Sequence, residues 1–397
     1  MRKSIVPVTV SSLMLCLTLT ACGGQPANNS TQETLATEST QTEGESNEMG
    51  STDTTAQSDV TQATASAVPN TIADDEDTLV ATYPQKFTQQ TYTDSSTGLS
   101  VSYNLFLPKD YDVSKSYPMV VFIADSTCAN GDAQQSLTQG LGALVWATDE
   151  WQAAHPTIVC VPTYPETILD DHNGYTTTEY VELTKRLIDS VSSEYSVDKS
   201  RVYGTGQSMG CMTTLILASE HPDLYAACMF VDGQWDVSTL KGLEGQRFVY
   251  FAAEDDTSAS SGMNEVMSMF DADSATYASA QWDGNWTPDQ LTSAANELFA
   301  QGKDANFISW ATGTITASAG NFAGPGGGGS SGKGGPSGEG GPSSEGDQSG
   351  EDSMGAAGGP STVTGQAGGM GGVAYHMASF DYAYRCIAAM EWLFQKA

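Results

Sequence analysis

Apolar runs that alternate with longer helical stretches constrain the fold of this chain more than any other feature. The runs that we interpret as strands are Met119–Ile123, Thr157–Val161, Val202–Tyr203, Cys228–Val231 and Phe248–Ala253. Unbroken apolar runs of this kind are typical of strands buried on both faces of a parallel sheet. Stretches with helical length and spacing lie among them, at Gly142–Ala154, Glu179–Tyr195, Ser208–Ser219 and Gly262–Met269. This alternation predicts an α/β fold with a mostly parallel central sheet and helices on both faces.

Further elements extend this pattern toward both ends of the chain. Phe87–Tyr92 and Leu99–Leu107 are predicted strands, joined by a turn around Asp94. A late strand at Asn306–Ala311 and a final helix at Phe380–Lys396 complete the pattern. We therefore expect one folded domain over residues 81–397.

Two segments lack the large apolar residues that a folded core needs. Residues 22–80 are rich in Ser, Thr, Gln, Glu and Asp, and residues 324–372 consist mostly of Gly, Ser and Pro. Such segments bury too little apolar surface to offset the entropy lost on ordering. We predict a disordered linker over 22–80 and a disordered insertion over 324–372 that interrupts the domain.

The first residues have the pattern of an export signal. Arg2 and Lys3 precede an apolar run from Ile5 to Thr18, which is too short to span a bilayer. The run leads into Leu19-Thr20-Ala21-Cys22-Gly23, which resembles the lipobox of bacterial lipoproteins. The resemblance implies a signal peptide over 1–21, lipid chains on Cys22 and a protein anchored to the outer face of the membrane at the bacterial cell surface. The alternative is an ordinary signal peptide with an incidental cysteine.

Charge and cysteine content narrow the choice of partners and cofactors. The formal net charge of −33 argues against nucleic acid as a partner, because phosphate binding needs a basic surface. We expect contact with the membrane only through the lipid anchor. The cysteines outside the first 22 residues are scattered in mostly apolar segments, and their spacing suggests neither zinc nor a disulfide framework. No metal or nucleotide motif is present, so we expect no cofactor.

A candidate nucleophile lies at the junction of a predicted strand and a predicted helix. Gly206-Gln207-Ser208-Met209-Gly210 matches the pattern G-x-S-x-G, and so does Gly328-Gly329-Ser330-Ser331-Gly332. Only Ser208 follows a strand and opens an apolar helix, which is the setting that a nucleophile elbow requires. The alternative for Ser208 is a serine that merely caps the helix.

A serine nucleophile needs a general base and an acid that orients the base. His376 follows Ser208 in the chain and lies in a predicted loop before the last helix, whereas His221 lies at the far end of the helix that Ser208 opens. The acid is expected after the strand Phe248–Ala253, where we choose Asp256 and keep Asp255 as the alternative.

The oxyanion that forms during acyl transfer needs backbone N–H donors. We assign them to Met209, directly after the nucleophile, and to Ser126, which follows the strand Met119–Ile123.

Several stretches together resemble secreted bacterial α/β-hydrolases of the polyhydroxybutyrate-depolymerase-like, feruloyl-esterase-like and prolyl-oligopeptidase-like group. They are Leu105–Pro108, Gln139–Ala147, Arg201–Gly210, Pro222–Ala227, Gly233–Asp236, His376–Phe380 and Glu391–Phe394. The resemblance covers roughly 85–323 and 373–397. It implies the α/β-hydrolase fold and Ser208, Asp256 and His376 as a catalytic triad. One departure concerns the oxyanion site, because Ala124-Asp125 stands where the family usually has His-Gly.

These observations predict a serine hydrolase that cleaves carboxylic esters, on a small molecule or a polymer, through an acyl-enzyme on Ser208. Two alternatives stay open. One is a serine peptidase of the prolyl-oligopeptidase type, and the other is a non-catalytic binding lipoprotein on the same fold. The sequence predicts neither the acyl and alcohol groups of the substrate nor the oligomeric state.

Overall fold

The computed structural model describes residues 69–72, 74–172, 174–316 and 371–395. All of them belong to one unit, Ala63–Ala397. The predicted signal peptide, Cys22, most of the predicted linker, and 324–370 of the predicted insertion lie outside the described residues, as does Ser330. In the described part of the chain, we find no helix with the length and hydropathy that crossing a membrane requires.

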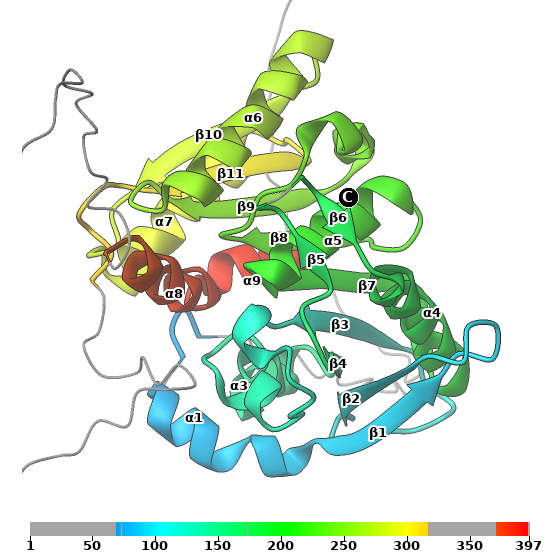
Figure 1. The fold of residues 1–397 in the computed structure, drawn as a ribbon. Helices are drawn as coiled ribbons and strands as arrows, with labels where there is room; N and C mark the ends of the chain where they lie inside the picture. Colours follow the sequence, from blue (N-terminus) through cyan, green and yellow to red (C-terminus); the bar gives the residue numbers. More distant parts are fainter. Residues whose placement is uncertain (1–68, 73, 173, 317–370, 396–397) are drawn as a thin grey trace, which may run out of the picture. The chain divides into compact units, whose positions relative to one another are not determined.

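A nine-stranded sheet forms the centre of the described fold (Figure 1), and its strands lie in the order β1-β2-β4-β3-β7-β8-β9-β11-β10. Their bounds are β1 Thr88–Thr93, β2 Ser100–Phe106, β3 Tyr117–Ile123, β4 Ile158–Thr163, β7 Val197–Gln207, β8 Ala227–Val231, β9 Phe248–Ala253, β10 Tyr277–Trp282 and β11 Ala305–Trp310. Strand β2 pairs antiparallel with β1 and with β4, and every later pairing in the order is parallel. A separate two-stranded hairpin consists of β5 (Leu169–Asp170) and β6 (Thr176–Thr177).

Helices cover both faces of this sheet. One face packs against α4 (Glu179–Glu194), α5 (Met209–Glu220) and α6 (Thr257–Asp273). The other packs against α1 (Glu76–Thr82), α2 (Gln135–Thr138), α3 (Asp149–Ala154), α7 (Pro288–Phe299), α8 (Gly371–Tyr384) and α9 (Ile387–Phe394).

Strand β3 shows how one apolar run serves both layers. Met119, Val121 and Ile123 belong to the first cluster, and Val120 and Phe122 belong to the second. Successive side chains of a strand point to opposite faces, so an unbroken apolar run is buried on both sides. The predicted α/β fold is confirmed.

Three expectations about helices were wrong. The predicted helix Gly142–Ala154 is a 3₁₀ turn at Val145–Ala147 followed by α3, because the Thr148 side chain caps a new helix. The predicted final helix Phe380–Lys396 contains the end of α8 and all of α9, which are separated where Cys386 leaves the helical conformation. Helix α1 begins inside the predicted linker and extends past its end at residue 80; it is held by the fully buried Leu79 and capped by Asp75. Strand β10 and helix α7 were not predicted at all.

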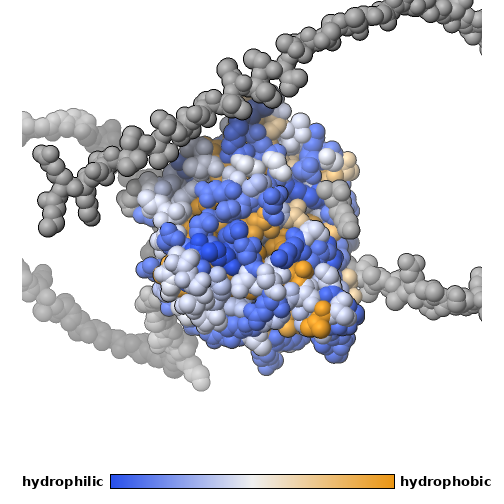
Figure 2. Space-filling model, turned by 90° about the vertical axis from the view of Figure 1, so that its right-hand side faces the viewer, coloured by the Kyte–Doolittle hydropathy of each residue, from blue (hydrophilic) through white to orange (hydrophobic). Residues whose placement is uncertain are grey.

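One face of the described surface is largely hydrophilic (Figure 2). Figure 2 shows one face on which hydrophilic residues predominate around a small hydrophobic group near its centre. Among the described residues, Val113 and Tyr175 are the large hydrophobic side chains that stand exposed. The five cysteines in this part of the chain are all free and buried, as their apolar neighbours predicted; they are Cys128, Cys160, Cys211, Cys228 and Cys386.

Candidate active site

Ser208 occupies a sharp turn between β7 and α5. Its backbone has φ 51° and ψ −117°, outside the regions that a non-glycine residue normally adopts. The turn is crowded, because a Cβ atom on Gly206 would lie 2.4 Å from the carbonyl carbon of Gly210. Together with the order of the sheet, this strand–turn–helix arrangement identifies the α/β-hydrolase fold.

The hydroxyl of Ser208 does not serve as a helix cap. No side-chain capping bond from Ser208 to α5 is present, whereas Thr178 and Asp256 both cap the helices that they precede. Ser208 is partly exposed and lines a cavity. The geometry therefore argues against the capping alternative and leaves the Oγ atom accessible from the cavity.

His376 and Asp256 make direct contact although 120 residues separate them in the chain. The Nδ1 atom of His376 lies 2.5 Å from Oδ2 of Asp256. The other oxygen of Asp256, Oδ1, accepts hydrogen bonds from the N–H groups of Ser258 (3.1 Å) and Ala259 (3.2 Å) and so caps α6. The carboxylate is thus fixed on both sides, and the contact at Nδ1 leaves Nε2 of the imidazole to exchange protons.

The expectation that His376 lies in a loop was wrong. It lies within α8, where its ring packs edge-on against Phe380 with 4.9 Å between the ring centroids. Helical geometry places residues four apart on the same face, so Phe380 supports the imidazole from the next turn.

Asp255, the alternative acid, points elsewhere. Its Oδ2 atom accepts a hydrogen bond of 2.7 Å from the N–H of Gly313. The geometry therefore favours Asp256 as the partner of His376.

The electrostatic environment of His376 stabilises its protonated form. Burial lowers the pKa of this imidazole, but the hydrogen bond with Asp256 and the negative charges of Asp232, Asp256 and Asp125 outweigh burial, so the pKa is raised above 6.5.

A cavity of about 820 Å³ brings the predicted site residues together. Its lining includes Ser126, Ser208, Met209, Asp256 and His376. The remaining lining comes mostly from the β5–β6 hairpin and its neighbours: Thr167, Leu169, Asp170, Asp171, His172, Thr176, Thr178, Met212, Gln234, Thr257 and Ser258. Sequence reasoning missed this second group, although His172 and the acids beside it were visible as a polar loop.

A hydrogen-bonded network fixes the loop that carries Ser126. The Thr127 N–H donates to Oδ1 of Asp125 (2.7 Å), and Nε2 of Gln139 contacts both Oδ2 of Asp125 and Oγ1 of Thr127. The Oε1 atom of Gln139 accepts a hydrogen bond of 3.1 Å from Gln207, the residue before Ser208. The network thus links the two backbone segments that present the N–H groups of Ser126 and Met209. Among the described residues, neither of these N–H groups has an acceptor.

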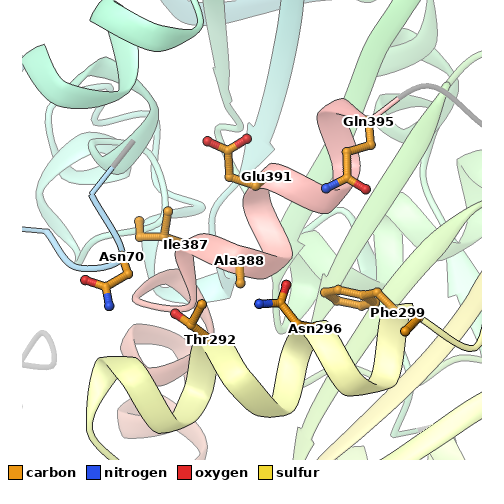
Figure 3. A pocket seen from close by; sticks show the side chains of 9 residues that line it. Asn70, Thr292, Asn296, Phe299, Ile387, Ala388, Glu391 and Gln395 are labelled. Carbon is orange, nitrogen blue, oxygen red and sulfur yellow. The ribbon is translucent and has the colours of Figure 1, made fainter. Parts of the chain in front are cut away.

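Two other features lie away from this cavity. A smaller cavity of about 390 Å³ lies between α7 and α9 and contains none of the predicted site residues (Figure 3). Glu182, Glu220 and His221 have potential metal-ligand atoms within 4.8 Å of one another, and His221 Nε2 lies 2.8 Å from Glu182 Oε1. This group lies at the end of α5 opposite Ser208.

Comparison with known proteins identifies related chains. A family model described as "Putative esterase" matches residues 95–314, more than half of the chain. Poly(3-hydroxyalkanoate) depolymerase C of Paucimonas lemoignei is 37% identical over 49 residues, which cover 12% of each chain.

Solved structures with a similar arrangement include a thermostable esterase and a feruloyl esterase module from Clostridium thermocellum. The first has a TM-score of 0.47 at 24% identity and covers 59% of this chain and 56% of its own. The second has a TM-score of 0.42 at 16% identity and covers 59% of this chain and 84% of its own. This chain therefore matches only 12% of the length of the depolymerase and 56% of the length of the thermostable esterase.

Proposed function

The chain belongs to the esterase family, and from this membership we propose that it is a serine hydrolase that cleaves carboxylic esters through an acyl-enzyme on Ser208. The observation that carries the proposal is the contact of 2.5 Å between His376 and Asp256 at the cavity that Ser208 lines. A fixed acid–imidazole pair beside an accessible serine is the arrangement that activates a weak oxygen nucleophile.

In the proposed first step, Nε2 of His376 takes the proton of the Ser208 hydroxyl while Oγ attacks the ester carbonyl carbon. Asp256 holds Nδ1–H and stabilises the imidazolium, and the N–H groups of Met209 and Ser126 hold the oxyanion. His376 then donates its proton to the departing alcohol, which leaves an acyl group on Ser208. In the second step, water activated by His376 releases the acid by the same route.

The test is labelling of the purified protein with a fluorophosphonate, which reacts with activated serines, followed by mass spectrometry of the modified peptide. We expect one phosphonate on Ser208, none in Ser208→Ala and much less in His376→Ala. The matched control is Ser330→Ala, in the second G-x-S-x-G sequence, which should label like the wild type. A folded wild-type protein that is not labelled would contradict the proposal and favour the non-catalytic binding lipoprotein.

Substrate panels separate the remaining alternatives. Simple aryl and alkyl esters, hydroxyalkanoate oligomers and feruloylated sugars test the ester chemistry that the names of the related proteins suggest. Proline-containing peptide amides test the peptidase alternative. Turnover of amides at rates that equal or exceed those of matched esters would favour the peptidase.

We also propose that the mature protein is anchored at the bacterial cell surface through lipid on Cys22, on the basis of the N-terminal sequence. The test is metabolic labelling with an alkyne fatty acid in a bacterial host. We expect incorporation in the wild type and none in Cys22→Ser. Equal incorporation in both would contradict the anchor.

A further inference from the structure

Asp232 lies directly after β8, beside the strand that leads to Asp256. Its N–H donates to the carbonyl oxygen of Phe251 (2.9 Å), and its Oδ1 atom accepts a hydrogen bond from the N–H of Ala253 (2.8 Å). The carbonyl of the same Ala253 accepts from the N–H of Asp256 (3.0 Å). Asp232 is fully buried, with 0% of its surface exposed. Its carboxyl group is therefore built into the backbone that supports the candidate acid.

The structural contacts of Asp232 do not require a carboxylate. Only Oδ1 has a partner, and Oδ2 is buried without a hydrogen-bond partner among the described residues. An asparagine carbonyl accepts the same hydrogen bond, and its amide nitrogen would take the buried position of Oδ2 without an acceptor. The backbone of Asp232 has φ 43°, a conformation that asparagine also tolerates well. A second, charge-dependent role would explain why an aspartate occupies this position.

The ionisable side chains that act on Asp232 come from four elements. They are Cys211 on α5, Tyr250 on β9, Asp256 at the start of α6 and His376 on α8. The ionisable groups that act on His376 are Asp256, Asp232 and Asp125. Asp232 and His376 therefore influence each other, and the full burial of Asp232 strengthens the interaction of its charge with neighbouring groups.

We propose that Asp232 is a second carboxyl group of the active site, a positioning residue that acts on His376 through its charge while Asp256 holds the imidazole directly. This inference rests on the proposed function in so far as His376 is the general base. Once Asp232 is ionised, above its pKa of about 8, its negative charge stabilises the imidazolium that forms when His376 accepts the proton of Ser208.

The titration of the two groups supports this role. Burial raises the pKa of Asp232 to about 8, although the charge of His376 and the hydrogen bond from Ala253 oppose the rise. Asp232 in turn raises the pKa of His376. Since each group affects the titration of the other, the two lose their protons in steps that belong to the pair.

The test is a histidine NMR titration of the full chain, since four histidines give few signals and His376→Gln assigns the one of interest. We expect Asp232→Asn to lower the pKa of His376 and to reduce kcat about ten-fold with KM unchanged above pH 8, where Asp232 is ionised. The matched control is Asp236→Asn, a nearby change at a carboxylate that caps a 3₁₀ turn, which should leave the His376 titration unchanged.

The wild type provides a measurement that needs no variant to fold. The His376 signal should show a second inflection near pH 8, where Asp232 loses its proton. A single inflection in the wild type, or an unchanged His376 pKa in folded Asp232→Asn, would overturn the inference, even if activity fell. The titration requires no turnover. If the protein hydrolyses no ester and is not labelled by a fluorophosphonate, the proposed function fails. The NMR titration of His376 still tests the role of Asp232 independently.

Discussion

Gly210 packs directly against the carbonyl oxygen of Ile123. A Cβ atom added to Gly210 would lie only 1.9 Å from that oxygen. The first turn of α5 and the end of β3 thus approach so closely that no side chain fits between them. This approach brings the Ser208 turn next to the loop that carries Ser126.

We predict that Gly210→Ala destabilises the fold by about 3 kcal/mol, because the added methyl group must displace backbone rather than a flexible side chain. Chemical denaturation monitored by circular dichroism measures the change. The control is Gly245→Ala, where the new methyl group meets no atom within 4 Å and the effect should stay within about 0.5 kcal/mol. Equal stability of the two variants would mean that β3 and α5 are not in this contact.

Asp256→Asn should lower kcat about 10⁴-fold with little effect on folding, since the amide retains the cap on α6 but no longer holds the imidazole in the required tautomer. Ester hydrolysis under saturating substrate measures it. Asp255→Asn serves as the matched control and should retain most activity, because Asp255 bonds to Gly313 instead of the imidazole. The reverse order of effects would make Asp255 the acid.

We predict that activity falls as the pH decreases through the pKa of His376, which lies above 6.5 in the folded protein. The reason is that His376 must be neutral to accept a proton. The same shift has a consequence for stability. A raised folded-state pKa stabilises the fold fully below the unfolded value of 6.5, and this contribution disappears as the pH rises through the folded-state pKa. A kcat/KM profile measured with a neutral ester tests the first point, and an acid limb below pH 6.5 would contradict it.

Gln139→Met should reduce kcat/KM about ten-fold, because it cuts the link between Asp125 and Gln207. It should also lower the melting temperature, because the buried Asp125 carboxyl loses a hydrogen-bond donor. We expect most of the loss in kcat, since the oxyanion N–H groups act mainly in the transition state. Gln135→Met provides the comparison. Gln135 bonds to the Thr127 carbonyl at the other side of the same loop. If both variants lose activity equally, the loss reflects general loosening of the loop.

Local patterns account for what the sequence predicted well. The turn at Ser208 needs only a strand, two glycines and a helix, which follow one another in the continuous stretch Val197–Glu220, so the sequence alone predicts it. The pairing of His376 with Asp256 spans 120 residues. It was predictable only because chain order in this fold dictates which loops meet. The catalytic roles of these residues stay predictions until labelling and kinetics test them.

Tertiary packing accounts for what the sequence did not predict. The first residues of α8, Gly371 and Gly372, disfavour helix, so the segment before His376 read as loop. Strand β10 lies at the edge of the sheet with an alternating burial pattern and small residues, and it has no unbroken apolar run. Nothing local marks Asp232 as buried, because its burial depends on α5, β9 and α8 closing around it.

The reaction of the buried cysteines with a thiol reagent reports on the unfolding of this protein. Burial raises the pKa of the Cys128, Cys160 and Cys386 thiols to about 12, so almost none of these groups is a thiolate at neutral pH. The same side chains are buried, so an alkylating reagent reaches them only in molecules that have opened. Under slow alkylation, the rate of modification tracks the equilibrium fraction of opened molecules, whereas alkylation that outpaces reclosing measures the rate at which the native core opens.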